Sequence, residues 1–138
     1  MVTDSDLLID DDMEPDPALN RITNAIIGAA MAVHTKLGAG YQESFYAHAL
    51  EVEFRRRGIF HEREKRFDVL YEGVVVGAGA VDFLVEGSVV VELKAVETLT
   101  PLFTAQVISH LKATNCRLGL ILNFNVKAIK NGLRRIAR

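Results

Sequence analysis

The chain has 138 residues and a net charge of −2; 49% of its residues are hydrophobic and 25% are charged. This length fits one domain of ordinary size, and this composition is typical of a globular protein. No apolar run reaches the ~18 residues of a membrane span, and the acidic start is unlike a secretion signal, so neither a membrane nor a secreted protein is expected.

The single cysteine, Cys116, cannot form an internal disulfide, which favours the cytoplasm, and no Cys/His spacing is of the zinc type. Seven of the 18 acidic residues lie in residues 1–17, which hold no Lys or Arg. The other 11 acidic residues and the 16 basic ones give residues 18–138 a net charge of +5. We therefore expect an acidic, flexible tail over residues 1–17 and one mildly basic domain over residues 18–138.

Two helices are expected first. Apolar residues recur at helical spacing in residues 19–37, before Gly38, and again in residues 42–57, before Gly58. Strand character then follows in three segments, residues 59–71, 74–85 and 89–95.

The second half of the chain is expected to add one more helix and two more strands. Thr100 and Pro101 predict a helix start, with a hydroxyl cap followed by proline. After that helix we expect three elements: a buried strand over residues 116–123, a short turn or helix near 126–129 and a short edge strand over 133–137. The order α-α-β-β-β-α-β predicts an α/β domain with a mixed sheet.

The loop between the second and third expected strands decides which side chains meet. With a three-residue loop, residues 86–88, Asp82 lies opposite Glu92. Opposed residues share a face with Cβ atoms roughly 4.5–5.5 Å apart, and alternation adds Lys94 to that face. A two-residue loop would instead turn Glu92 to the other face.

Asp82, Glu92 and Lys94 on one face would suit divalent-metal chemistry. Two opposed carboxylates repel each other unless positive charge lies between them, and Mg²⁺ prefers oxygen ligands. A metal polarises a phosphate, while a lysine beside it orients water or stabilises the charge on phosphorus. The alternative is that Asp82 is a polar residue near a turn and that Glu92 and Lys94 form a surface pair.

Further motifs accompany the hairpin in a fixed order. Residues 40–46, Gly-Tyr-Gln-Glu-Ser-Phe-Tyr, have the form GxxExxY. Asp82 follows, then Val-Glu-Leu-Lys-Ala-Val at 91–96, Gln106, and Leu-Asn-Phe-Asn at 122–125. This set resembles the GxxExxY protein family, a branch of the PD-(D/E)XK nuclease superfamily, over about residues 20–138. Each motif is weak alone, and the order makes the resemblance specific.

The resemblance implies a restriction-endonuclease-like core, with a mixed sheet of about four to five strands flanked by helices. It implies Asp82, Glu92 and Glu43 as ligands of Mg²⁺ or Mn²⁺, Lys94 as the catalytic lysine, and Gln106 as a site residue on the next helix. The implied activity is metal-dependent hydrolysis of phosphodiester bonds in DNA, or alternatively in RNA.

Two positions depart from the family's pattern. Val81 replaces the proline that names the superfamily, and His110 stands where a tyrosine often follows the glutamine, on the same helix face as Gln106. Simpler roles also stay open. Glu43 could be an exposed acid favoured by the helix dipole, Gln106 an exposed helix residue, and Tyr46 a partner of Glu43, a nucleic-acid contact or a packing residue.

Basic residues cluster around Gly58 and near the C-terminus: Arg55, Arg56, Arg57, Arg63, Lys65 and Arg66, and Arg134, Arg135 and Arg138. They suit phosphate contacts, although a solvated surface is the simpler use of most of them. The hypotheses are a nuclease, a catalytically silent domain of that fold that binds nucleic acid or a protein partner, and an assembly subunit whose acidic tail docks on a basic surface. A homodimer is expected where so small a domain must grip a duplex.

Overall fold

The computed structural model describes residues 16–138, so most of the predicted acidic tail, residues 1–15, lies outside the described part. The helices are α2 (Pro17–Leu37), α3 (Glu43–Arg56), α4 (Pro101–Thr114) and a short 3-10 helix, η1 (Ile129–Gly132). The strands are β1 (His61–Tyr71), β2 (Val74–Val85), β3 (Val89–Lys94), β4 (Leu118–Asn123) and β5 (Leu133–Ala137). The predicted order of elements is confirmed.

Local signals explain where the helices begin and end. The Asp16 carboxylate accepts hydrogen bonds from the first turn of α2, including Ala18 N at 2.9 Å, so this helix begins two residues before its predicted start. Gly38, with a φ of 69°, ends it. Thr100 stands at the N-cap of α4 and Pro101 begins the helix, both as predicted. The predicted capping hydrogen bond to the Thr100 hydroxyl is not formed.

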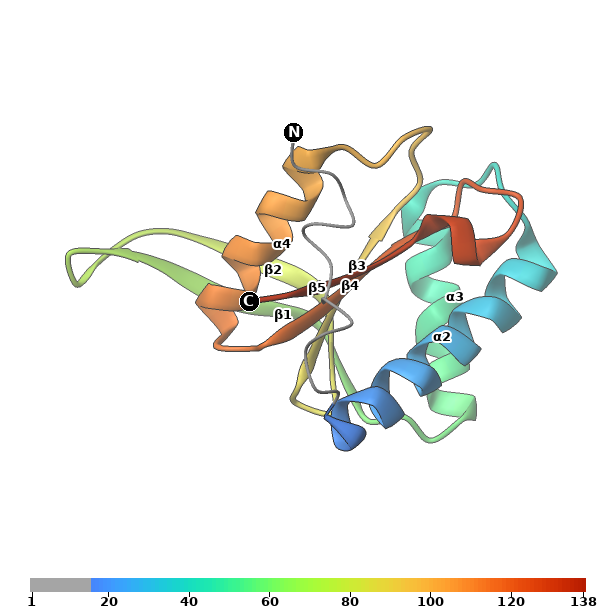
Figure 1. Cartoon of the computed structure of the whole chain (residues 1–138), viewed down its shortest axis with the longest axis horizontal. Helices are drawn as coiled ribbons and strands as arrows, with labels where there is room; N and C mark the ends of the chain where they lie inside the picture. The colour runs from blue at the N-terminus through green and yellow to red at the C-terminus, as the bar shows by residue number, and fades with distance from the viewer. Residues whose placement is uncertain (1–15) are drawn as a thin grey trace.

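The five strands form one mixed sheet in the order β1-β2-β3-β4-β5 (Figure 1). β3 and β4 pair in parallel, with α4 as the connection between them, and the other neighbours pair antiparallel. The predicted α/β class with a restriction-endonuclease-like mixed sheet is therefore confirmed, and residues 133–137 form the predicted edge strand.

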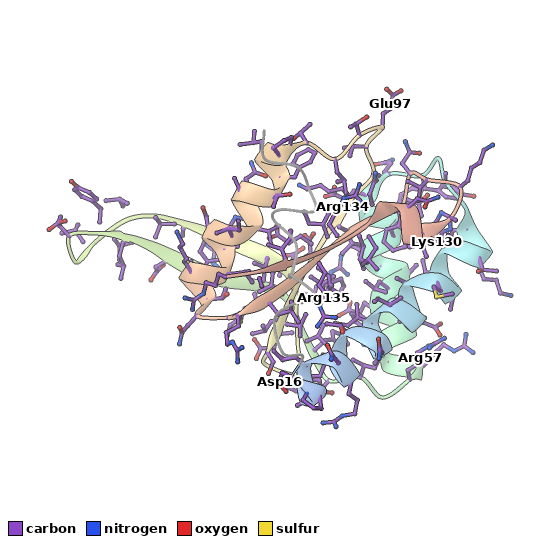
Figure 2. All side chains as sticks on the ribbon, in the orientation of Figure 1. Asp16, Arg57, Glu97, Lys130, Arg134 and Arg135 are labelled. Atoms are coloured by element: carbon purple, nitrogen blue, oxygen red, sulfur yellow. The ribbon has the colours of Figure 1, made fainter. Side chains whose placement is uncertain are left out.

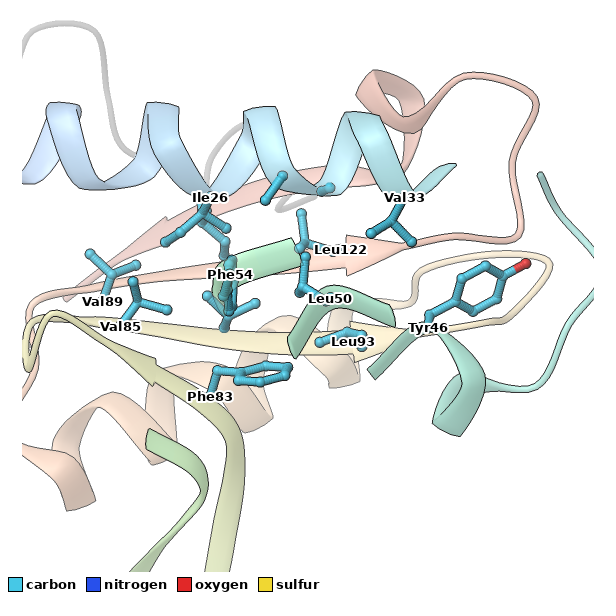
Figure 3. Packing of buried hydrophobic residues seen from close by; sticks show 14 of the residues in the cluster. Ile26, Val33, Tyr46, Leu50, Phe54, Phe83, Val85, Val89, Leu93 and Leu122 are labelled. Carbon is cyan, nitrogen blue, oxygen red and sulfur yellow. The ribbon is translucent and has the colours of Figure 1, made fainter. Parts of the chain in front are cut away.

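Helices cover both faces of the sheet. Helices α2 and α3 pack on one face, where Ile26, Leu50, Phe54, Phe83 and Leu122 are among the residues of the larger core (Figure 3). Helix α4 packs on the other face, over a smaller core. Strands β3 and β4 are buried on both faces, so a polar residue on β3 lies inside the protein. Within residues 16–138, no helix combines the length and apolar content needed to cross a bilayer.

The β2–β3 hairpin has the predicted three-residue loop. Val85 pairs with Val89 and Phe83 with Val91, which is the register that brings Asp82 toward Glu92. Pairing stops at Phe83, however, so Asp82 is the first residue of β2 that has left β3.

Strand β2 turns over at Asp82, which corrects the expectation of simple alternation. Phe83 packs in the core under α2 and α3, whereas Val81 packs in the core under α4. Regular alternation would put these two residues on one face. On the neighbouring strand, Glu64 lies opposite Asp82 and has a φ of 51°, an uncommon conformation for a residue with a side chain. The kink therefore falls at the predicted site itself.

Candidate active site

The predicted site lies where β2 leaves β3. A pocket of about 170 Å³ opens there, and α3, β1, β2 and β3 all contribute to its walls. Its lining residues are Glu43, Ser44, Ala47, Arg63, Glu64, Asp82 and Leu93. Four consecutive elements of the chain thus meet at Asp82.

Asp82 is half-buried and is held by the backbone of the next strand. Its Oδ2 accepts the N–H of Leu93 at 2.7 Å. Burial raises the pKa of Asp82, and the charge of Glu64 adds to this, while the hydrogen bond from Leu93 and the charges of Lys94 and Arg63 act in the opposite direction. An ionised Asp82 is therefore costly in the folded protein, and a nearby cation would relieve that cost.

Glu92 is a buried acid, 7% exposed, on the central strand β3. Its Oε2 lies 2.6 Å from Nδ1 of His110 on α4, so the imidazole N–H can donate to the carboxylate. Burial raises the pKa of Glu92 and so does the charge of Asp82, whereas His110 and Lys94 lower it. The surface ion pair considered as an alternative for Glu92 and Lys94 is absent from residues 16–138.

Lys94 follows two residues later and is half-buried. Its Nζ lies 4.6 Å from the centre of the Phe103 ring on α4, at the distance of a cation–π contact. Its positive charge lowers the pKa of Asp82, Glu92 and Glu43 alike. One ammonium group is therefore shared electrostatically by three carboxyl groups.

Glu43 is exposed in the first turn of α3, the position that the helix dipole favours. Partial desolvation raises its pKa, and the charges of Asp82 and Glu92 raise it further, against Lys94. The structure thus brings Glu43 within electrostatic reach of the two strand carboxylates.

Gln106 does not join this group in the described structure. It is exposed on α4, one turn before His110, and no hydrogen bond within residues 16–138 links it to the carboxyl groups. Tyr46 is fully buried: its hydroxyl donates to Gly38 O at 2.6 Å and its ring stacks on Phe124. Of the three roles considered for Tyr46, packing is the one observed.

Three residues near the site had no assigned role in the sequence. His110 supports Glu92 directly, and Glu64 lines the pocket beside Asp82. Asn123 is buried at the end of β4, and its amide donates to Val96 O and accepts from Val96 N, which holds the chain just after Lys94. Two of them had a signal: Asn123 belongs to the Leu-Asn-Phe-Asn motif, and His110 stands at the position where a tyrosine often follows Gln106.

The basic stretch around Gly58 is largely paired within the protein. Arg55 and Arg63 lie within 4 Å of Glu51, and Arg56 and Arg57 lie within 4 Å of Glu53. These pairs support the simpler expectation of a solvated surface over that of phosphate contacts for these arginines.

The carboxylate oxygens of the candidate site fit a hard divalent cation that needs few ligands from the protein. Within residues 16–138, no three His, Cys, Asp or Glu side chains form a ready group of metal ligands. Mg²⁺ usually keeps several waters and binds through one or two carboxylates plus substrate phosphates. Asp82 and Glu92 would meet that smaller requirement, and a cation between them would offset the effect of the Asp82 charge, which raises the pKa of Glu92.

Comparison with protein families matches residues 20–136 to the PD-(D/E)XK nuclease superfamily. No curated protein and no solved structure matches the chain. The matched segment runs from α2 to β5 and includes every site residue described above.

Proposed function

Because the chain belongs to the PD-(D/E)XK nuclease superfamily, we propose that it is a divalent-metal-dependent nuclease that hydrolyses phosphodiester bonds, with DNA as the expected substrate and RNA as the alternative. The observation that carries this proposal is the meeting of Asp82, Glu92 and Lys94 where β2 leaves β3. Within the superfamily we place the chain in the GxxExxY branch, because residues 40–46 keep that motif and Glu43 begins α3.

Asp82 and Glu92 would hold Mg²⁺ or Mn²⁺, with Glu43 as a further ligand. When bound, such a cation polarises the phosphate and lowers the pKa of a coordinated water. Lys94 stabilises the negative charge that builds on the phosphoryl oxygens, and the Phe103 ring keeps its ammonium in place. Gln106, exposed on α4 near the site, contacts the nucleic acid.

The direct test is cleavage of single- and double-stranded DNA and RNA by the purified full chain, with Mg²⁺, Mn²⁺ or a chelator. We expect metal-dependent cleavage that falls by about 1,000-fold or more in both Lys94→Ala and Asp82→Ala. Lys94→Ala removes a charge that stabilises the transition state, and Asp82→Ala removes a proposed ligand of the metal. Lys36→Ala is the matched control, since Lys36 is an exposed lysine at the end of α2, and it should keep full activity.

Two results would contradict the proposal. Cleavage retained by both Lys94→Ala and Asp82→Ala would rule out the assigned site. Salt-sensitive binding of nucleic acid without turnover under any metal would instead support a catalytically silent domain of the same fold.

A further inference from the structure

The outer part of the β1–β2 hairpin, residues 67–80, extends beyond the body of the protein (Figure 1). We call this segment the arm. Its outer half exposes six large apolar side chains, each 42–69% exposed: Val69, Leu70, Tyr71, Val74, Val75 and Val76. The paired residues Leu70 and Val75 lie on one face of the hairpin, and the next pair, Tyr71 and Val74, lies on the other. Both faces of the arm therefore expose large apolar side chains, which is typical of an interaction site.

The arm also carries an open strand edge. β1 is an end strand of the sheet, 11 residues long. Its outer residues hold no Lys or Pro, the residues that commonly protect such edges from pairing with another chain. Both the backbone edge and the side chains of the arm are therefore suited to contact another protein.

Charge argues against nucleic acid as the occupant of this surface. The arm holds Asp68 and Glu72 and no basic residue, so it would repel a phosphate backbone. Labelled basic residues such as Arg57, Lys130 and Arg135 lie over the body of the molecule, not on the arm (Figure 2).

A groove of about 580 Å³ lies between the arm and α4. On the arm side the Phe67 ring covers Gly79 so closely that a Cβ there would meet it at 2.7 Å, and the neighbouring wall is mostly apolar. On the α4 side the wall includes Lys112 and His110. The groove therefore combines apolar residues of the arm with one acid, Asp68, on the arm side and one lysine, Lys112, on the α4 side. The tip of the arm is apolar with one acid, Glu72, which can pair with Lys112 of another copy.

These two surfaces are complementary to each other but belong to one chain. We propose that the arm binds a second copy of this chain in a symmetric dimer, in which the tip of each arm occupies the groove between the arm and α4 of the other copy. Because a two-fold interface uses the same patch twice, each dimer contains two such contacts. A stable interface buries about 800 Å² on each partner, so the dimer would have to cover both the exposed apolar side chains of the arm and the groove.

This arrangement would place the second copy next to the site. His110, which bonds to Glu92, forms part of the groove wall. Each arm would therefore lie beside His110 of the other copy, the residue that bonds to Glu92.

Sedimentation of the full chain without nucleic acid or metal tests the proposal independently of nuclease activity. We expect twice the mass of one chain at concentrations on the order of 10–100 μM. Leu70→Asp/Val75→Asp changes a directly paired, exposed couple on the arm and should raise the dissociation constant by about 100-fold or more. Val52→Asp, an equally exposed valine on α3, should leave the dimer intact.

The charge contact provides a second test that does not disturb apolar packing. Lys112→Glu should weaken the dimer by about 5- to 10-fold, and adding Glu72→Lys should restore it to within about 2-fold. Circular dichroism checks that each variant is folded.

Three outcomes would overturn the proposal: a monomer at all these concentrations, a dimer that survives Leu70→Asp/Val75→Asp, or a Glu72→Lys/Lys112→Glu variant no tighter than Lys112→Glu. A monomer whose arm variants bind DNA less tightly would assign the arm to nucleic acid instead. None of these outcomes alters the cleavage test of Lys94 and Asp82.

Discussion

The inner and outer parts of the β1–β2 hairpin use similar apolar residues in opposite environments. The inner part of β2, from Val81 to Val85, is buried apart from Asp82, whereas Val74, Val75 and Val76 at the outer end are 55–62% exposed. The two parts meet at Asp82, where the strand turns over.

This contrast teaches that burial of a strand depends on what covers it. In the inner part, residues 83–85 pair with β3, and the apolar side chains pack either in the core under α2 and α3 or in the core under α4. The outer part has left β3, and only α4 lies near it. The proposed role of Asp82 as a metal ligand suits this boundary, because its carboxylate is partly desolvated by the core and still lines a pocket.

The largest effect on stability is expected in the inner part. Phe83 is fully buried and packs edge-on against Phe54 with ring centres 5.2 Å apart. Phe83→Ala should lower the free energy of unfolding by about 3–5 kcal/mol, because it removes the ring and leaves a cavity. Urea unfolding measures this change, and a loss below about 1 kcal/mol would show that the inner part is not packed as described.

An intermediate effect, on metal binding and cleavage, is expected for His110, the residue that hydrogen-bonds to Glu92. His110→Ala should weaken Mn²⁺ binding and cleavage by about 10- to 100-fold, because Glu92 loses the donor that orients it. His110→Asn keeps a donor near the position of Nδ1 and should recover part of the loss.

Calorimetric titration of Mn²⁺ without nucleic acid separates this positioning role from a contact with substrate. Ser109→Ala, the exposed neighbour on the same helix, is the control and should bind Mn²⁺ normally. Equal Mn²⁺ affinity in His110→Ala and the unaltered chain would argue against the role.

Asp82→Asn is expected to have a smaller effect on stability, and to increase stability where Phe83→Ala decreases it. Burial raises the folded-state pKa of Asp82 above its ordinary value, so its stabilising contribution is complete below the unfolded-state pKa and is lost as the pH rises through the folded-state pKa. In chelator at pH 7, the neutral asparagine should therefore raise Tm by about 3 °C while abolishing cleavage.

The pH dependence checks the cause of this gain. Below the ordinary aspartate pKa of about 4, Asp82 is neutral in both states, and the gain in Tm should vanish. A gain in Tm that is the same at about pH 3 as at about pH 7 would point to packing instead of charge.

The smallest effect is expected in the outer part. Leu70→Ser should change the free energy of unfolding of the monomer by no more than about 0.5 kcal/mol, because Leu70 is 63% exposed. Urea unfolding at low protein concentration measures this against Phe83→Ala. A loss comparable to that of Phe83→Ala would abolish the contrast between the two parts of the hairpin.

Much of the fold was predictable from local patterns. Helical spacing located α2 and α3, and Gly87 at φ 65° helped form the three-residue loop that sets the register of β2 on β3. Glu92 and Lys94 then had to share one side of β3, since alternation depends only on neighbouring residues. The part that failed was alternation at Asp82, because the kink opposite Glu64 leaves no local sequence signal.

The sequence by itself determined the order of elements, the hairpin register and the candidate residues Asp82, Glu92 and Lys94. Only the tertiary structure decided that His110, 18 residues away on α4, bonds to Glu92, and that Asn123 holds the chain beyond Lys94. It also decided that the valines of the arm are exposed while those of β3 are buried. The physical reason is that periodicity and loop length are properties of adjacent residues, whereas hydrogen-bond partners and burial depend on which distant element packs over them.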